Sequence, residues 1–241
     1  MPERDRVLSL SAVRRYYDWL GRRLDSQGFY ENPALDALVA HANFEDADSV
    51  FEFGCGTGKF ASRLLENHLP DSATYFGYDV SSVMVDLAKR RIALHGDRVR
   101  VALSDGSVRF PLRDQSVDRI VSSYVLDLLS ESDIRQFFAE AHRSLTTGGK
   151  VCLASLTEGV APLSRIVSSL WRAAFRLSPK MVGGCRPIGF DAFIDPRQWR
   201  IAYRAVLAPF GVPSEVVVLD VLDERGAAVG GRPSEDAPSV R

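Results

Sequence analysis

The chain has 241 residues, of which 46 % are hydrophobic, and its 30 Lys and Arg nearly balance its 31 Asp and Glu. This length and composition predict one globular domain, or one domain with an insertion. The balanced charge excludes a uniformly basic nucleic-acid binder, so we expect no nucleic-acid partner. The three cysteines, Cys55, Cys152 and Cys185, are too far apart for a metal site, and we expect no metal.

The N-terminus, MPERDRVLSL, carries charges where a signal peptide needs an apolar core. No apolar run along the chain reaches the length of a membrane span. We therefore expect a cytoplasmic protein without stable membrane insertion.

Two helices are predicted ahead of the first strand. Residues 11–26 place apolar side chains at helical spacing, among them Tyr16 and Tyr17. Asn32 and Pro33 predict the start of a second helix, which runs to about residue 43, because Asn caps a helix and Pro fits its first turn. Residues 1–48 are therefore predicted to form an N-terminal helical cap.

The most informative segment is the glycine-rich stretch VFEFGCGTG at residues 50–58. An apolar run ending at Phe53 predicts a strand, and residues 59–67 have helical spacing. Between them Gly54, Gly56 and Gly58 alternate, which predicts a tight turn with positive φ where a ligand approaches the backbone. Strand, glycine turn and helix form the opening unit of a nucleotide-binding α/β domain.

Several interpretations of this turn compete. A phosphate-binding P-loop is excluded, because Phe60 stands where Ser or Thr is required after Gly58-Lys59. A dinucleotide fingerprint fits if it begins at Gly56, but that frame leaves Gly54 unexplained. A third frame, E-x-G-x-G-x-G, begins at Glu52, and a plain turn without a ligand is the fourth interpretation.

Alternating strands and helices follow the glycine turn. Residues 74–79 predict a strand ending in Asp79, residues 99–103 a strand followed by Asp105 and Gly106, and residues 118–123 a fourth strand. A helix over residues 131–145 and a strand over residues 150–157 complete the pattern, which predicts a parallel sheet.

The pattern changes after residue 157. Residues 163–177 predict an amphipathic helix, and a Gly- and Pro-rich loop follows to residue 196; together they suit an insertion at about 158–198 that forms a lid over the substrate. Two strand-like runs at 199–207 and 215–222 predict a terminal hairpin. Residues 224–241 lack core-forming side chains and are predicted to be a disordered tail.

The ordered series of motifs resembles the class I S-adenosylmethionine-dependent methyltransferases. The similarity covers about residues 48–157, and its parts are the segment from Glu52 to Gly58, Asp79, Asp105, the strand at 118–123 and the phrase LTTGGKVCL at 145–153. Tyr16-Tyr17-Asp18 before the first strand makes the small-molecule branch with the ubiquinone- and menaquinone-type enzymes most similar. The implied fold is α/β, a Rossmann-like, doubly wound, mostly parallel seven-stranded sheet with a terminal antiparallel hairpin, over residues 49–223.

The resemblance implies S-adenosyl-L-methionine as the cofactor. Acidic side chains at the strand ends suit its sulfonium and ammonium charges, whereas a dinucleotide pyrophosphate needs positive surroundings. The expected cofactor-binding residues are Tyr17, Glu52, Gly54, Gly56, Gly58, Asp79, Val80, Met84, Asp105, Gly106 and Ser123.

The methyl acceptor is predicted to be a small, apolar or aromatic molecule. Expected substrate residues are Tyr16, Tyr124, Trp171, Arg186 and Phe190. Asp127 lies just past the fourth strand and is the candidate general base, with a helix-capping role as its alternative. Two other functions stay open: a nucleotide-dependent oxidoreductase with the same first unit, and a non-catalytic binding subunit with a methyltransferase fold.

Overall fold

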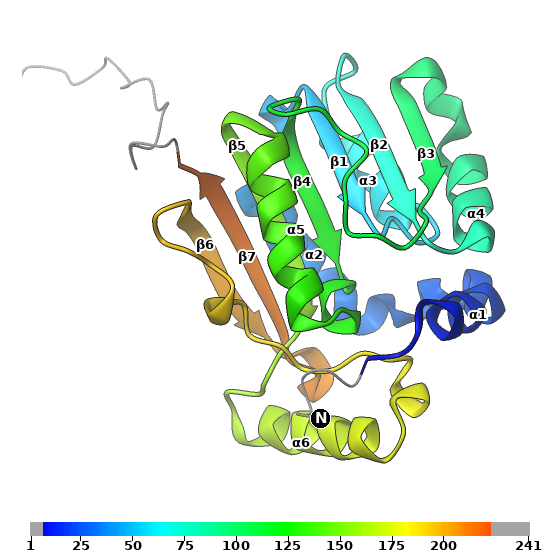
Figure 1. Cartoon of the computed structure of the whole chain (residues 1–241), viewed down its shortest axis with the longest axis vertical. Coiled ribbons are helices and arrows are strands. Elements are labelled where there is room, and N and C mark those ends of the chain that lie inside the picture. Colours follow the sequence, from blue (N-terminus) through cyan, green and yellow to red (C-terminus); the bar gives the residue numbers. More distant parts are fainter. Residues whose placement is uncertain (1–6, 223–241) are drawn as a thin grey trace, which may run out of the picture.

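The computed structural model describes residues 7–222 as one layered α/β domain (Figure 1). The predicted tail at 224–241 lies outside the described residues. The helices are α1 (Leu10–Leu20), α2 (Gly28–Ala42), α3 (Lys59–Asn67), α4 (Ser82–Ile92), α5 (Glu131–Ser144) and α6 (Pro162–Leu177). The strands are β1 (Ser49–Phe53), β2 (Thr74–Asp79), β3 (Val99–Leu103), β4 (Val117–Ser123), β5 (Leu145–Leu156), β6 (Trp199–Leu207) and β7 (Ser214–Val221).

The strands form one seven-stranded sheet in the order β3-β2-β1-β4-β5-β7-β6. The first five strands pair in parallel, whereas β7 runs antiparallel to both β5 and β6. This is the predicted mostly parallel sheet with a terminal hairpin. Because the order reverses between β1 and β4, the carboxyl ends of these two strands leave a crevice where ligands bind in such sheets.

Helices cover both faces of the sheet. Side chains of α2, α3 and α4 pack with Tyr75 and Val121 in one apolar core. Side chains of α5 pack with Phe51 and Ile120 on the opposite face. The central strands are buried on both faces, which explains their nearly continuous apolar runs.

The N-terminal helical cap differs from the prediction in its boundaries. The first helix, α1, ends at Leu20 because Gly21 adopts a φ of +49°, and a 3-10 helix over Gly21–Gln27 follows. The second helix begins at Gly28, four residues before the predicted start, and encloses Pro33. Pro33 lies near the start of this helix and has no N–H to donate to the carbonyl of Phe29, four residues earlier.

Arg119 on β4 joins the sheet to the end of α2. Its side chain is buried, and it donates hydrogen bonds to the carbonyl oxygens of Ala42 and Asn43 at 2.8 and 2.7 Å. The last carbonyls of a helix have no partner within the helix and carry partial negative charge. The guanidinium therefore caps α2 and holds it against the sheet edge away from the crevice.

We expect Arg119→Met to lower the free energy of unfolding by about 1–3 kcal/mol, because the variant keeps the apolar stem and leaves buried carbonyls without donors. Urea unfolding followed by circular dichroism measures the loss. The matched control is Arg113→Met at an exposed position, with a change within about 0.5 kcal/mol. Equal effects of the two substitutions would contradict the capping role.

Candidate active site

The turn between β1 and α3 uses its three glycines for different reasons. Gly54, Gly56 and Gly58 have φ of +82°, +50° and +73°. A Cβ on Gly54 would lie 2.2 Å from a methyl group of Val125, and one on Gly58 would lie 2.9 Å from the Cα of Ala88. Gly54 and Gly58 are therefore required by close packing, whereas a Cβ on Gly56, which lines a cavity, would lie 3.3 Å from a methyl group of Leu24. Gly58 does not line the cavity, so its contact with the cofactor stays a prediction.

Asp79 at the end of β2 connects this turn to the next one. Its carboxylate accepts hydrogen bonds from the backbone N–H groups of Gly56 at 2.8 Å and Ser81 at 2.9 Å. Burial raises the pKa of Asp79 above its usual value, and the backbone donors oppose that rise. Each oxygen keeps a further lone pair, so the carboxylate can also accept from the two hydroxyls of a ribose.

Glu52 is buried at the end of β1, beside Asp79. The hydroxyl of Tyr75 donates to its carboxylate at 2.5 Å. Burial raises the pKa of Glu52 to about 7, and the charge of Asp79 adds to the rise. A cationic ligand bound beside these two neighbouring carboxyl groups would stabilise their ionised forms.

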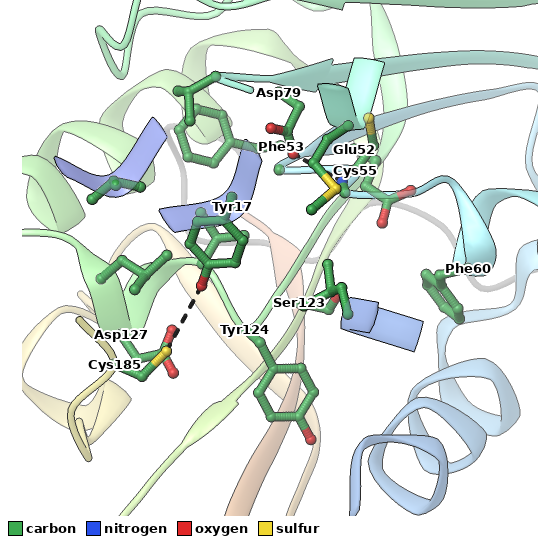
Figure 2. A pocket seen from close by; sticks show the side chains of 18 of the residues that line it. Tyr17, Glu52, Phe53, Cys55, Phe60, Asp79, Ser123, Tyr124, Asp127 and Cys185 are labelled. Atoms are coloured by element: carbon green, nitrogen blue, oxygen red, sulfur yellow. Dashed lines mark hydrogen bonds between the residues drawn. The ribbon is translucent and has the colours of Figure 1, made fainter. Parts of the chain in front are cut away.

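A cavity of about 480 Å³ opens at the carboxyl ends of the parallel strands. Figure 2 shows Glu52, Asp79 and Cys55 on one wall, with Tyr17, Asp127 and Cys185 together on another. Most of the predicted site residues line the cavity: Tyr17, Glu52, Gly54, Gly56, Asp79, Val80, Met84, Gly106, Ser123, Tyr124 and Asp127. The crevice predicted from strand order is therefore the place where these side chains meet.

Asp105 lies outside the cavity lining, and its contact with the cofactor stays a prediction. Its side chain is exposed and accepts a hydrogen bond from the backbone N–H of Ser107 at 2.8 Å. Its neighbours Ser104 and Gly106 line the cavity instead. The local turn satisfies the Asp105 carboxylate, which explains why it points to the rim.

Two predicted substrate residues, Tyr16 and Trp171, do not line the cavity but contact the segment around Cys185, which does. Tyr16 packs on Gly183, where an added Cβ would come within 2.8 Å of the ring. The indole N–H of Trp171 donates to the carbonyl of Cys185 at 3.0 Å, and Cys185 is the residue that faces the cavity. Both aromatic rings therefore hold the segment after α6 in place.

Arg186 and Phe190, which were predicted as substrate residues, make structural contacts. The guanidinium of Arg186 donates to the backbone carbonyls of Asp127 at 3.2 Å and Leu129 at 2.5 Å. Phe190 is fully buried in the core on the α5 face of the sheet. Neither residue lines the cavity.

Asp127 lies in the turn after β4, and its side chain is fully buried. Neither carboxylate oxygen has a hydrogen-bond partner at full hydrogen-bonding geometry among the described residues, and the backbone N–H groups of Asp127 and Leu156 oppose only part of the rise in its pKa. Burial raises the pKa of Asp127 to about 7, and the positive charge of Arg186 opposes the rise. An incompletely partnered acid in a ligand cavity, with a pKa near neutrality, is suited to accept a proton.

Tyr30 and Glu31 are cavity residues that the sequence analysis missed. Burial raises the pKa of Glu31 to about 7, and a hydrogen bond from Tyr30 opposes the rise. The predicted start of α2 at Asn32 left both residues in a connection. An earlier helix start would have placed them on α2, facing the sheet.

Cys185 also lines the cavity. Its sulfur lies 3.9 Å from the hydroxyl of Tyr17, within hydrogen-bond distance (Figure 2). Burial raises the pKa of both groups, so the thiol is a neutral part of the wall.

Helix α1 and the following 3-10 helix are fastened over the cofactor side of the cavity. Arg14 donates to the carbonyl of Ser104 at 2.9 Å, and Ser81 donates to Asp18 at 2.5 Å. Asp25, in the 3-10 helix, forms a salt bridge of 2.6 Å with Arg91 of α4. The contacts of Arg14 and Asp18 join α1 to the turns that follow β3 and β2. Helix α1 therefore closes the cavity over the glycine turn.

The strand order and the position of this site are those of Rossmann-like methyltransferase domains. Residues 50–149 match the family described as "Methyltransferase domain". Residues 50–149 therefore carry an S-adenosylmethionine-dependent methyltransferase domain. The class implies S-adenosylmethionine as cofactor, and the chemistry of the lining fits it: the carboxylates of Glu52 and Asp79 suit a cationic ligand that carries ribose hydroxyls.

Relatives of this chain differ in what their names say they methylate. A malonyl-[acyl-carrier protein] O-methyltransferase of Marinomonas sp. (strain MWYL1) is 30 % identical over 152 residues, 62 % of this chain and 53 % of that protein. The tRNA N(3)-methylcytidine methyltransferase Mettl2 of Drosophila melanogaster is 27 % identical over 124 residues, 50 % of this chain and 38 % of that protein. The chain thus spans about half the length, or less, of these curated relatives.

Solved structures confirm the fold. The geranyl diphosphate C-methyltransferase of Streptomyces coelicolor A3(2), solved with S-adenosyl-L-homocysteine, has a TM-score of 0.60 at 15 % identity, covering 79 % of this chain and 76 % of that chain. Within residues 7–222, no helix is long and apolar enough to cross a membrane.

We expect Gly56→Val to abolish measurable binding of S-adenosylhomocysteine, because a branched side chain would enter the cavity at the glycine turn. Calorimetric titration measures the affinity. The matched control is Gly96→Val, since Gly96 also has a positive φ of +62° but borders open space away from the cavity. Both variants carry backbone strain, so only the cavity variant loses affinity if the assignment is correct.

Proposed function

We propose that this protein transfers a methyl group from S-adenosylmethionine to a small, apolar or aromatic molecule. The observation that carries the proposal is the continuity of one cavity. It runs from the acids at the ends of β1 and β2 to a second end lined by Tyr17, Tyr124 and the buried Asp127.

The second end of the cavity favours an apolar acceptor. Tyr17, Tyr30 and Tyr124 present rings, and Leu156 adds an aliphatic wall. The Tyr124 hydroxyl is occupied by a hydrogen bond to Ser214 at 2.9 Å. Aromatic walls with few polar groups are typical of sites for small molecules.

The cavity shape and charge disfavour a nucleic-acid acceptor, although one relative is named for action on tRNA. Arg14 and Asp18 fasten α1 across the cavity, and Asp25 fastens the 3-10 helix that follows. This arrangement leaves no open groove for a folded polymer. Buried acids at Asp127 and Glu31 would repel phosphates.

The two other functions are less well supported. A dinucleotide-dependent oxidoreductase needs positive surroundings for a pyrophosphate, yet Glu52 and Asp79 stand beside the glycine turn. A non-catalytic subunit would not need an incompletely partnered, buried Asp127, since such a group costs stability unless chemistry uses it.

The proposed reaction is an in-line displacement at a methyl group. S-adenosylmethionine supplies the electrophilic methyl and a good leaving group, so the protein aligns the acceptor and excludes water. The aromatic walls orient the acceptor toward the cofactor end. Ionised Asp127 then accepts the proton that an acceptor hydroxyl, or another acidic group, loses as the new bond forms.

The proposal is tested with purified protein and methyl-labelled S-adenosylmethionine. We expect S-adenosylhomocysteine to bind and NAD or NADP not to bind in calorimetry. Label should then pass to the low-molecular-weight, organic-extractable fraction of a metabolite extract, and the Gly56→Val variant is the inactive control. Label that appears only in the RNA or protein fraction would contradict the small-molecule acceptor and leave the methyltransferase activity standing.

We expect Asp127→Asn to lower turnover at least about a hundredfold while S-adenosylhomocysteine affinity stays within about twofold. The parent kcat/KM should rise with pH through about 7, because the base acts in its ionised form. The variant should lose that rise. An unchanged pH profile in the variant would show that Asp127 is not the base.

Stability gives an independent measure of the same group. The pKa of Asp127 rises from 3.8 to about 7 on folding, so its protonated form favours the folded state. The parent therefore loses stability as pH rises from about 4 to 7, and Asp127→Asn removes this contribution, by roughly 1–4 kcal/mol at pH 8 relative to pH 4. Urea unfolding at the two pH values compares parent and variant.

A further inference from the structure

Helix α6 turns its apolar side away from the protein. Its buried positions are Ser164, Ser168 and Phe175. The larger aliphatic side chains point outward, with exposed fractions of 62 % for Leu163, 58 % for Ile166, 66 % for Leu170 and 82 % for Leu177. In Figure 1 the helix is the outermost element at the end of the molecule where the parallel strands finish. None of its side chains lines the cavity, and the substrate lid expected over about residues 158–198 stays a prediction.

Neighbouring segments extend this apolar surface. Phe210 is 78 % exposed, and its neighbour Gly211 packs on Leu163 and Val167 of α6. The ring of Phe29, itself 58 % exposed, lies 5.8 Å from that of Phe210. We call this surface the apolar end face; its members are Phe29, Val160, Leu163, Ile166, Leu170, Leu177, Met181 and Phe210.

The exposed large apolar side chains are concentrated on the apolar end face and are not spread evenly over the molecule. Of the 13 large apolar side chains that are exposed within residues 7–222, eight belong to the apolar end face. Single exposed apolar side chains are common, but a contiguous group of this kind marks an interaction surface.

The charges beside the face have one sign. Residues 160–181 contain Arg165, Arg172, Arg176 and Lys180 and no acidic residue, although the whole chain has slightly more acids than bases. Arg172 pairs with Glu158, just before the helix, and residues 158–181 together carry four basic side chains and one acidic side chain. An apolar stripe flanked by Arg and Lys is the pattern of a helix that lies in the interface of an anionic lipid bilayer.

Other occupants fit this surface less well. A second copy placed about a two-fold axis would bring the same basic side chains of the two helices together. A protein partner that inserts an anchor needs a concave pocket, whereas the apolar side of α6 is a projecting helix. A flat lipid surface accepts a projecting helix and supplies anionic headgroups for its arginines.

We propose that the apolar end face binds peripherally to an anionic lipid membrane, with α6 lying in the headgroup region. The segment that follows α6 leads to Cys185 in the cavity wall, so the cavity lies directly behind the bound surface. The proposal does not depend on the identity of the methyl acceptor.

The test is flotation of the full chain with lipid vesicles. We expect co-flotation with phosphatidylcholine vesicles that contain about 30 % phosphatidylglycerol, and at least about tenfold weaker binding to phosphatidylcholine alone or at high salt. Ile166→Glu combined with Leu170→Glu should lower binding to the anionic vesicles at least about tenfold.

The matched control is Leu94→Glu, because Leu94 is 98 % exposed and belongs to the 3-10 helix after α4, outside the apolar end face. This control should bind vesicles like the parent. Circular dichroism and S-adenosylhomocysteine affinity should be unchanged in all variants, since each substituted side chain is exposed and outside the cavity lining.

Three results would overturn the proposal. One is the absence of vesicle binding by the parent protein. Another is equal binding by the parent and the double variant. The third is a dimer in sedimentation velocity that the double variant abolishes, without vesicle binding, since the face would then join two copies of this chain.

Discussion

The hydrogen bond from the backbone of Gly56 to the carboxylate of Asp79 is the contact on which the site depends. The same carboxylate accepts from the backbone of Ser81, so one side chain fastens the turn after β1 to the turn after β2. Because Gly56 must adopt a positive φ and carry no Cβ facing the cavity, the turn keeps its shape only with glycine and with its acidic partner. The position of α1 follows, since Asp18 is fastened to Ser81 and Asp25 to the end of α4.

Buried acids set the chemical character of the cavity. Glu31, Glu52 and Asp127 each have a pKa raised to about 7, with burial as the largest cause. Such groups cost folding free energy, and a globular core would replace them with apolar side chains. Their arrangement suits the two tasks of the proposed reaction: Glu52 lies beside Asp79 at the proposed cofactor end, whereas Asp127 lies in the part of the lining that contains tyrosines, where the proposed acceptor would lose a proton. A cavity so arranged suits group transfer between two ligands better than binding of a single one.

Local patterns in the chain predicted most of the fold and the cofactor end of the site. Strands β2, β3 and β6 have the expected bounds, because apolar runs between turn residues are signals of short range. Errors arose where an element began without a strong signal. The start of α2 at Gly28 was missed, because the capping pattern at Asn32-Pro33 was stronger, and the cavity residues Tyr30 and Glu31 were lost with it.

The sequence by itself determined the order of strands and helices, the glycine turn and the acid at the end of β2, since each depends on neighbours within a few residues. Only the tertiary structure decided which side chains face the cavity. Helical spacing shows that α6 has an apolar side but cannot show whether that side meets protein or solvent. In the same way, Trp171, Arg186 and Phe190 support the wall, because their direction is set by contacts with segments far away in the chain. Burial is the sum of such long-range contacts, and no local pattern contains it.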